Sequence, residues 1–218
     1  MGIKENLNEI FRKLPVGVEL IAATKIRSVD EVLEAIECGV KIIGENYVQE
    51  AEEKFKFIGK KVKWHMIGHL QKNKVKKAIE IFDMIETLDN FSLAKEIDKH
   101  AKRKEIIYPC LIEINSGREI QKSGVLPEDI EEVIAEISTL ENITIKGLMT
   151  MGPLVENPED MRQYFRLVKE LFDKLKEKCF PNVEMKYLSM GMTDTWEIAI
   201  QEGANMVRIG TGIFGPRK

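Results

Sequence analysis

A lysine, an arginine and two clusters of small hydroxyl-bearing residues are the parts of this 218-residue sequence best suited to chemistry. Lys25 ends a short apolar run, Arg208 lies inside another, and Ser189 and Thr211 follow two late apolar runs. A lysine whose stem is enclosed and partly desolvated has a lowered pKa, and its neutral amine attacks carbonyl groups. The other interpretation of Lys25 is a side chain that reaches water just beyond the end of a strand.

Two glycine-containing segments suit a phosphate group. They are SMGMTD at residues 189–194 and GTG at residues 210–212, and each follows an apolar run. Glycine lets backbone N–H groups approach an anion closely, and the hydroxyls of Ser189 and Thr211 add donors. Loops after the seventh and eighth strands of a βα barrel commonly bind phosphate, so these segments predict such a site if the chain forms a barrel.

Arg208 lies two residues before Gly210, so both should lie on the same face of a strand. A guanidinium inside a barrel needs a partner, because an unpaired buried charge is costly. We consider Glu45, Glu113 or a ligand for that role. Asn46 either hydrogen-bonds a ligand or caps the next helix.

A metal site is not expected. His65 and His69 are four residues apart, but they straddle a strand end and the sequence lacks the glutamate of H-E-x-x-H. The three cysteines form no CxxC pair, which favours reduced thiols.

Short apolar runs alternate with amphipathic segments along the whole chain. The alternation predicts eight parallel strands, at residues 17–25, 40–45, 62–67, 84–88, 107–114, 143–149, 184–188 and 206–209. Helices are expected at residues 28–39, 48–57, 73–82, 92–104, 127–140, 158–178 and 194–202, with an extra helix at the N-terminus. We therefore predict an α/β fold, a single (β/α)8 TIM-type barrel formed by one domain over residues 1–218. A doubly wound open sheet is the alternative.

Composition restricts the classes of function. With 33 basic and 36 acidic residues the formal net charge is −3, which disfavours general nucleic-acid binding. The N-terminus has charges among its apolar residues and no signal-peptide core, and no apolar run reaches the ~20 residues of a membrane-spanning helix. We expect a soluble protein of the cytoplasm with no nucleic-acid or membrane partner.

Six motifs together resemble one family, the pyridoxal phosphate homeostasis proteins, also described as YggS/PROSC-type pyridoxal-phosphate-binding proteins. They occur in order along nearly the whole chain: AATK at 22–25, GENYVQE at 44–50, WHMIGHLQKNK at 64–74, GLMTMGP at 147–153, LSMGMTDTWEIAI at 188–200 and VRIGTGIFGPR at 207–217. The resemblance implies a barrel like the N-terminal domain of alanine racemase.

The resemblance also implies the cofactor, pyridoxal 5′-phosphate, and its ligands. Lys25 would carry the cofactor as an internal aldimine, and Arg208 would face the pyridine nitrogen. The phosphate would be held by Ser189, Gly210 and Thr211, and the cofactor would be lined by Asn46, Met149 and Met190. Partners implied are free amino acids and the apo forms of pyridoxal-phosphate enzymes, with the protein itself expected to be a monomer.

An arginine at the pyridine nitrogen weakens the cofactor as an electron sink, because arginine keeps its proton. The chain ends at Lys218, so we expect no second, all-β domain of the alanine racemase kind. Both features favour a carrier of pyridoxal phosphate with little or no turnover. A low-rate amino-acid racemase and a Schiff-base aldolase without cofactor are the alternatives.

Overall fold

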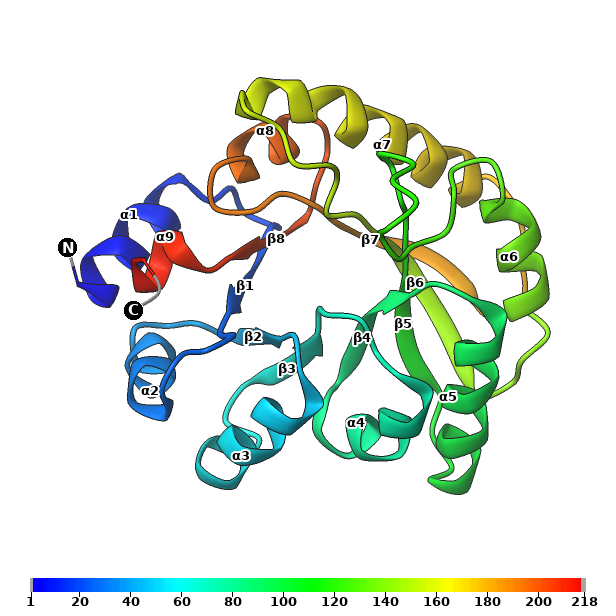
Figure 1. Ribbon diagram of the computed structural model, residues 1–218, viewed down its shortest axis with the longest axis horizontal. Helices are drawn as coiled ribbons and strands as arrows, with labels where there is room; N and C mark the ends of the chain where they lie inside the picture. Colours follow the sequence, from blue (N-terminus) through cyan, green and yellow to red (C-terminus); the bar gives the residue numbers. More distant parts are fainter. Residues whose placement is uncertain (1, 217–218) are drawn as a thin grey trace.

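The computed structural model describes residues 2–216, and in that range eight parallel strands pair in sequence order and close into a barrel. Closure comes from β8, which pairs with β1 as well as with β7 (Figure 1). The strands are β1 (Glu19–Ala23), β2 (Ile42–Glu45), β3 (Lys63–Met66), β4 (Met84–Leu88), β5 (Tyr108–Glu113), β6 (Ile143–Met149), β7 (Val183–Ser189) and β8 (Met206–Ile209). The predicted TIM-type barrel is confirmed, and the open doubly wound alternative is wrong.

Helices follow the strands and surround the barrel (Figure 1). They are α1 (Ile3–Lys13), α2 (Val29–Glu37), α3 (Val48–Ile58), α4 (Val75–Ile81), α5 (Phe91–Arg103), α6 (Ile130–Ile137), α7 (Arg162–Lys176), α8 (Trp196–Gln201) and α9 (Thr211–Phe214), with 3-10 turns η1 (Lys72–Lys74) and η2 (Pro158–Met161). The expected N-terminal helix is α1. The short helix α9 occupies the segment predicted to be a phosphate-binding loop.

Local sequence signals account for the start of α2. The Ser28 hydroxyl accepts a hydrogen bond from the Glu31 N–H at 3.2 Å, and the Glu31 carboxylate accepts from the Ser28 N–H at 2.8 Å. This reciprocal capping box satisfies two N–H groups that the first helical turn leaves unpaired.

The barrel interior has an apolar layer with charged residues above it. The apolar layer is formed by Ile21, Ile42, Met84, Leu111, Met149 and Met206. Glu86, Glu113 and Arg208 each follow one of these residues by two positions, so they lie on the same strand face, one step nearer the carboxyl ends of the strands. The fold therefore directs three buried charges toward the end of the barrel where βα barrels carry their active sites.

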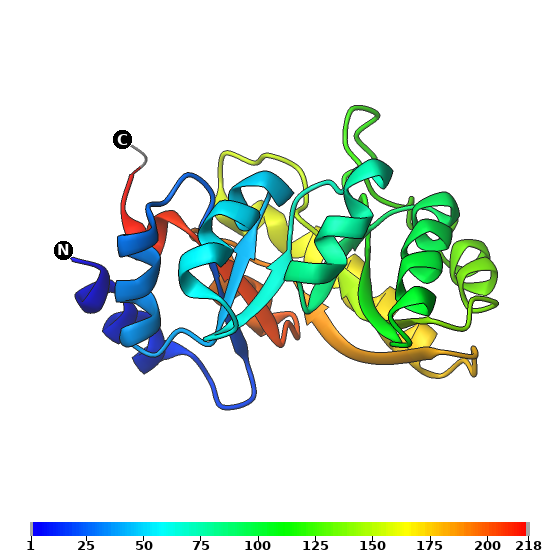
Figure 2. The same cartoon turned by 90° about the horizontal axis from the view of Figure 1, so that it is seen from below.

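Helices α1 and α9 lie side by side, and loops gather at the carboxyl ends of the strands. The Asn6 amide donates to the Ile213 carbonyl at 2.9 Å, which joins α1 to α9. The loops after β5 and β6 project from the same side of the barrel in Figure 2. No helix among residues 2–216 is long and apolar enough to cross a bilayer.

Candidate functional site

Lys25 lies two residues beyond β1, in the turn that leads to α2. Its side chain is half-buried, and its ammonium lies 5.0 Å from the centre of the Tyr47 ring. Within residues 2–216 the Lys25 ammonium has no hydrogen bond and no ion pair. An amine that is not neutralised by a carboxylate at the mouth of the barrel is free to meet a ligand.

The backbone next to Lys25 is held by a buried trio. The Lys54 ammonium lies 2.6 Å from both the Thr24 carbonyl oxygen and Glu45 Oε1, and the Thr24 hydroxyl donates to Glu45 Oε1 at 2.6 Å. Burial raises the pKa of Glu45, and the charge and hydrogen bond of Lys54 oppose that rise. Glu45 therefore pairs with Lys54, and the expectation that it could pair with Arg208 is wrong.

Arg208 belongs to a different buried chain of contacts inside the barrel. One of its terminal nitrogens donates to the Ser189 hydroxyl at 2.6 Å, and the other donates to the Thr150 carbonyl at 2.8 Å. Ser189 in turn donates to Glu86 Oε2 at 2.7 Å, while Glu86 Oε1 lies 2.6 Å from His65 Nδ1. Glu86 is thus the carboxylate linked to Arg208, through the hydroxyl of Ser189.

The surroundings of Glu86 favour the charged form of its carboxylate, and Arg208 also stays charged. Burial alone would raise the pKa of Glu86, but His65, Arg208 and the hydrogen bond from Ser189 together hold that pKa below its ordinary value. Burial lowers the pKa of Arg208, and the charges of Glu86 and Glu113 oppose this shift. Because a guanidinium begins from such a high pKa, Arg208 stays cationic at neutral pH.

The loop after β7 meets the start of α9 at the mouth. The Thr211 hydroxyl donates to the Thr193 hydroxyl at 3.1 Å, and the Gly212 N–H donates to the same oxygen at 3.2 Å. A Cβ atom at Gly212 would lie 2.9 Å from Ile209 Cγ2 and 3.1 Å from Thr193 Cγ2. Glycine is therefore needed for this close approach, and the contact brings two hydroxyls together.

The remaining predicted residues occupy different surroundings. Asn46 follows β2 and lines a cavity with Tyr47 and His69. Met149 is buried in the inner apolar layer, below the mouth. Met190 is buried in the outer hydrophobic layer, between strands and helices, so its side chain faces away from the barrel interior.

Glu113 is the third charge of the upper interior and was predicted only as a partner of Arg208. It is 4% exposed, and burial together with the charge of Asp89 raises its pKa to about 7, against the opposing charges of Arg208 and Lys122. No ion pair joins Glu113 to Arg208 within the described chain. Residues 2–216 hold no cluster of three or more His, Cys, Asp or Glu side chains suited to a metal ion.

Glu86 was not predicted as a site residue, and His65 was considered only as a metal ligand. A usable signal was present, because Met84 and Glu86 are two positions apart in an apolar run, and residues at that spacing share a strand face. The same alternation places Arg208 correctly in the interior.

Comparison with known proteins gives a consistent group of relatives. The profile of the family described as "Alanine racemase, N-terminal domain" matches residues 2–218. A pyridoxal phosphate homeostasis protein of Aquifex aeolicus is 44% identical over 229 residues, and the match covers 100% of both chains. A protein of the same name from Haemophilus influenzae is 36% identical and is covered over 97% of its length.

Solved structures agree with these relatives. PipY of Synechococcus elongatus without PLP superposes with a TM-score of 0.91 at 32% identity, covering 98% of this chain and 100% of that one. A structure of PipY with PLP bound gives a TM-score of 0.90 at the same identity. An alanine racemase of Clostridium difficile gives 0.79 at 19% identity, with 55% of its length covered, and shows the shared fold alone.

Proposed function

This chain belongs to the family of pyridoxal phosphate homeostasis proteins, and from that premise we propose that it holds pyridoxal 5′-phosphate covalently at Lys25. In this role it binds and carries the cofactor in the cytoplasm, with little or no catalytic turnover. The observation that carries the proposal is the state of Lys25, a half-buried amine at the barrel mouth without a carboxylate partner among the described residues.

The contrast with Lys54 supports the choice of Lys25. Lys54 is also near the mouth, but its ammonium is buried and bonded to Glu45 and to the Thr24 carbonyl. Its loss of charge would leave the buried Glu45 unpaired, so Lys54 is a poor nucleophile. Lys25 gives up no ion pair when its amine bonds to an aldehyde.

The donor groups near the mouth are suited to the phosphate group of the cofactor. Hydroxyl and N–H groups are provided by Thr193 in the loop after β7 and by Thr211 and Gly212 at the start of α9, where only glycine allows so close an approach. Such uncharged donors suit a phosphate ester. Gly210 precedes them, and Asn46 lines a neighbouring cavity.

Arg208 is proposed to face the pyridine nitrogen. When bound, the cofactor would supply an aldehyde for amines and a ring that withdraws electrons. Arg208 keeps its own proton, because its charge is balanced by Glu86 through Ser189. It therefore offers the ring a hydrogen bond but no proton, which supports a binding protein over a rapid catalyst.

The test is the absorption spectrum of the purified protein with added pyridoxal phosphate. Wild type should develop a yellow band that borohydride removes, leaving the cofactor irreversibly attached to the peptide that contains Lys25. Lys25→Ala should lack the band while keeping the circular dichroism of the fold. Lys41→Ala, at an exposed lysine just before β2, is the matched control and should behave as wild type.

A borohydride-sensitive band that persists in Lys25→Ala would contradict the proposal and assign the role to another lysine. Carriage is tested separately, by mixing the loaded protein with an apo form of a pyridoxal-phosphate enzyme and following recovery of that enzyme's activity. Recovery slower than with the same amount of free cofactor, reaching the same end point, is the result expected for a protein that holds and then releases it.

A further inference from the structure

A second cavity opens at the mouth on the opposite side of the barrel from Lys25. Its volume is about 270 Å³, and it lies among the loops after β5, β6 and β7. In the closed eight-stranded barrel β5 is four strands from β1 in either direction, so Glu113 and Lys25 belong to opposite walls. The apolar part of the lining comes from Ile114, Met151, Pro153, Leu154 and Met192.

Glu113 is the buried acid of this cavity. Its side chain belongs to the lining although the residue is only 4% exposed. Within residues 2–216 its carboxylate has neither a hydrogen bond nor an ion pair, whereas the buried carboxylates of Glu45 and Glu86 each have both a hydroxyl donor and a basic side chain close by. A carboxylate without a protein partner takes its hydrogen bonds from water or from a ligand in the cavity that it lines.

The cations around the cavity already have partners of their own. Lys122 Nζ lies 2.5 Å from Glu119 Oε2 and 3.0 Å from the Gly152 carbonyl. Arg208 is linked to Glu86 through Ser189. Glu113 therefore has no basic partner of its own, and a cation that donates hydrogen bonds would complement its carboxylate.

His69 and Asp89 are two further titratable residues near Glu113. His69 Nδ1 lies 3.7 Å from Asp89 Oδ2 and 3.2 Å from the Ser123 hydroxyl, so Asp89 has its own basic neighbour. Asp89 also acts on Glu113 as a like charge and raises its pKa. A positive ligand would relieve this repulsion, whereas an anionic ligand would add to it.

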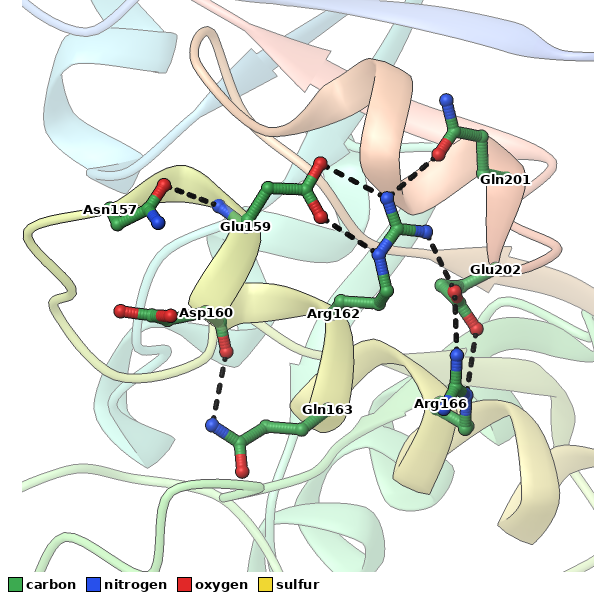
Figure 3. A network of polar contacts seen from close by, with 8 residues as sticks. All are labelled: Asn157, Glu159, Asp160, Arg162, Gln163, Arg166, Gln201 and Glu202. Carbon is green, nitrogen blue, oxygen red and sulfur yellow. Dashed lines mark hydrogen bonds and ion pairs between the residues drawn. The ribbon is translucent and has the colours of Figure 1, made fainter.

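Hydrogen bonds outside the cavity join the elements that follow two of its walls. Figure 3 shows Arg162, at the start of α7, bonded to Glu159 of η2 and to Gln201 and Glu202 at the end of α8. The loop after β6 leads into η2, and the loop after β7 leads into α8. This network joins the two elements that follow the Met151 and Met192 walls, which supports a preformed cavity.

We propose that this cavity binds a small primary amine, with its ammonium group on the Glu113 carboxylate and its apolar body against Met151 and Met192. The size favours a small molecule, because the cavity lies just below the ~300–1,000 Å³ typical of sites for drug-sized ligands. The inference goes beyond the proposed function, since it concerns a site that needs neither Lys25 nor a cofactor.

The test uses two probes of the same shape, n-hexylamine and n-hexanol. The methionine methyl groups are labelled with 13C, and their NMR signals are followed as each probe is added to the full-length protein. The signals of Met151 and Met192 should shift and saturate with hexylamine at a concentration at least tenfold lower than with hexanol. Equal affinity for the two probes would overturn the proposal without the use of any variant.

Variants then assign the amine contact. Glu113→Gln should weaken hexylamine binding at least tenfold while leaving hexanol binding unchanged, and Glu113→Asp should retain part of the preference. Glu156→Gln, an exposed carboxylate on the loop after β6, is the matched control and should bind as wild type does. Unchanged hexylamine binding in Glu113→Gln would exclude Glu113 as the partner.

The variant Lys25→Ala distinguishes binding of the amine in the cavity from its reaction with a cofactor held at Lys25. The same methionine shifts in Lys25→Ala would place the amine in the cavity, whatever becomes of the proposed function. Their loss in that variant, while Glu113→Gln binds normally, would overturn the cavity site and leave covalent cofactor binding at Lys25 in place.

Discussion

Ser189 and Glu86 are 103 positions apart in the chain, and the Ser189 hydroxyl donates its proton to Glu86 Oε2 at 2.7 Å inside the barrel. The Ser189 hydroxyl oxygen accepts a hydrogen bond from an Arg208 terminal nitrogen at 2.6 Å. A hydroxyl has one proton to donate, so a donation from Ser189 to a phosphate would replace the one to Glu86. In this structure Ser189 bridges Glu86 and Arg208.

This arrangement predicts different outcomes for the two hydroxyl residues proposed to hold phosphate. Thr211 is exposed, so Thr211→Val should weaken pyridoxal phosphate binding by about 1–3 kcal/mol with little effect on the free energy of unfolding. Ser189→Ala should lower the free energy of unfolding by a similar ~1–3 kcal/mol, because it leaves buried polar groups unpaired. Urea unfolding and equilibrium titration of both variants measure the two quantities.

Pyridoxal, which lacks the phosphate, is the control ligand for this comparison. Thr211→Val should bind pyridoxal as wild type does, since the lost contact is with phosphate. A variant that loses affinity equally for both ligands would show that Thr211 does not contact the phosphate. A Ser189→Ala protein of unchanged stability would contradict the bridging role of the hydroxyl.

The trio behind Lys25 predicts a strong effect of Lys54. Lys54→Met should lower the free energy of unfolding by about 3–5 kcal/mol, because it leaves the fully buried Glu45 without its ion-pair partner. The double variant Lys54→Met with Glu45→Gln should recover a substantial part of the loss, since the unpaired charge is then gone. Chemical unfolding of the two single variants and the double variant gives the coupling between them.

Additive losses in that cycle would mean that the two side chains act independently. The exposed ion pair between Lys56 and Glu53 on the same helix is the matched control, and its disruption should cost no more than about 1 kcal/mol.

The alternation of inward-facing and outward-facing residues along each strand could predict much of this site. The wrong pairing of Glu45 with Arg208 arose because this rule was not applied to every strand. Lys25 and Arg208 were placed by alternation in β1 and β8, and Arg208 is indeed interior. The same rule applied to β2 puts Ile42 inside and Glu45 outside, which agrees with the pairing of Glu45 with Lys54.

Other features needed three-dimensional information. The contact between Ser189 and Glu86 crosses the barrel from β7 to β4, and it depends on the width of the interior and on which side chains fill it. A residue pattern fixes the face of a strand and does not identify the partner across the barrel. The helix α9 was missed because its four residues are too few to show a helical period.

Glu113 predicts an unusual dependence of stability on pH. Its folded-state pKa, raised to about 7 from an ordinary 4.5, means that ionisation opposes folding. This cost is absent below pH 4.5, grows as the pH rises toward 7 and is then constant. Between pH 5 and pH 8 wild type should therefore lose about 1–3 kcal/mol of unfolding free energy that Glu113→Gln does not lose.

The measurement is urea unfolding of both proteins at pH 5 and pH 8. Four other charged or titratable groups face this carboxyl, namely His69, Asp89, Lys122 and Arg208, and all of them remain in the variant. The difference between the two proteins therefore reports on Glu113. Identical pH dependence in both would contradict a raised pKa at this position.

The last prediction concerns turnover and rests on the buried position of Arg208. Its charge is balanced by Glu86 through Ser189, so it has no tendency to give up its proton. Removal of the Cα proton of an amino acid draws on the ring as an electron sink, and a ring nitrogen beside a permanent cation makes that sink weaker. The loaded protein should therefore show a spectral change with alanine while exchange of the alanine Cα proton with deuterated solvent stays far below the ~1–10³ per second typical of enzymes. Proton NMR of L-alanine in deuterium oxide measures this exchange, with an authentic alanine racemase as the positive control. Exchange within the enzymatic range, lost in Lys25→Ala, would replace the carrier by a true racemase.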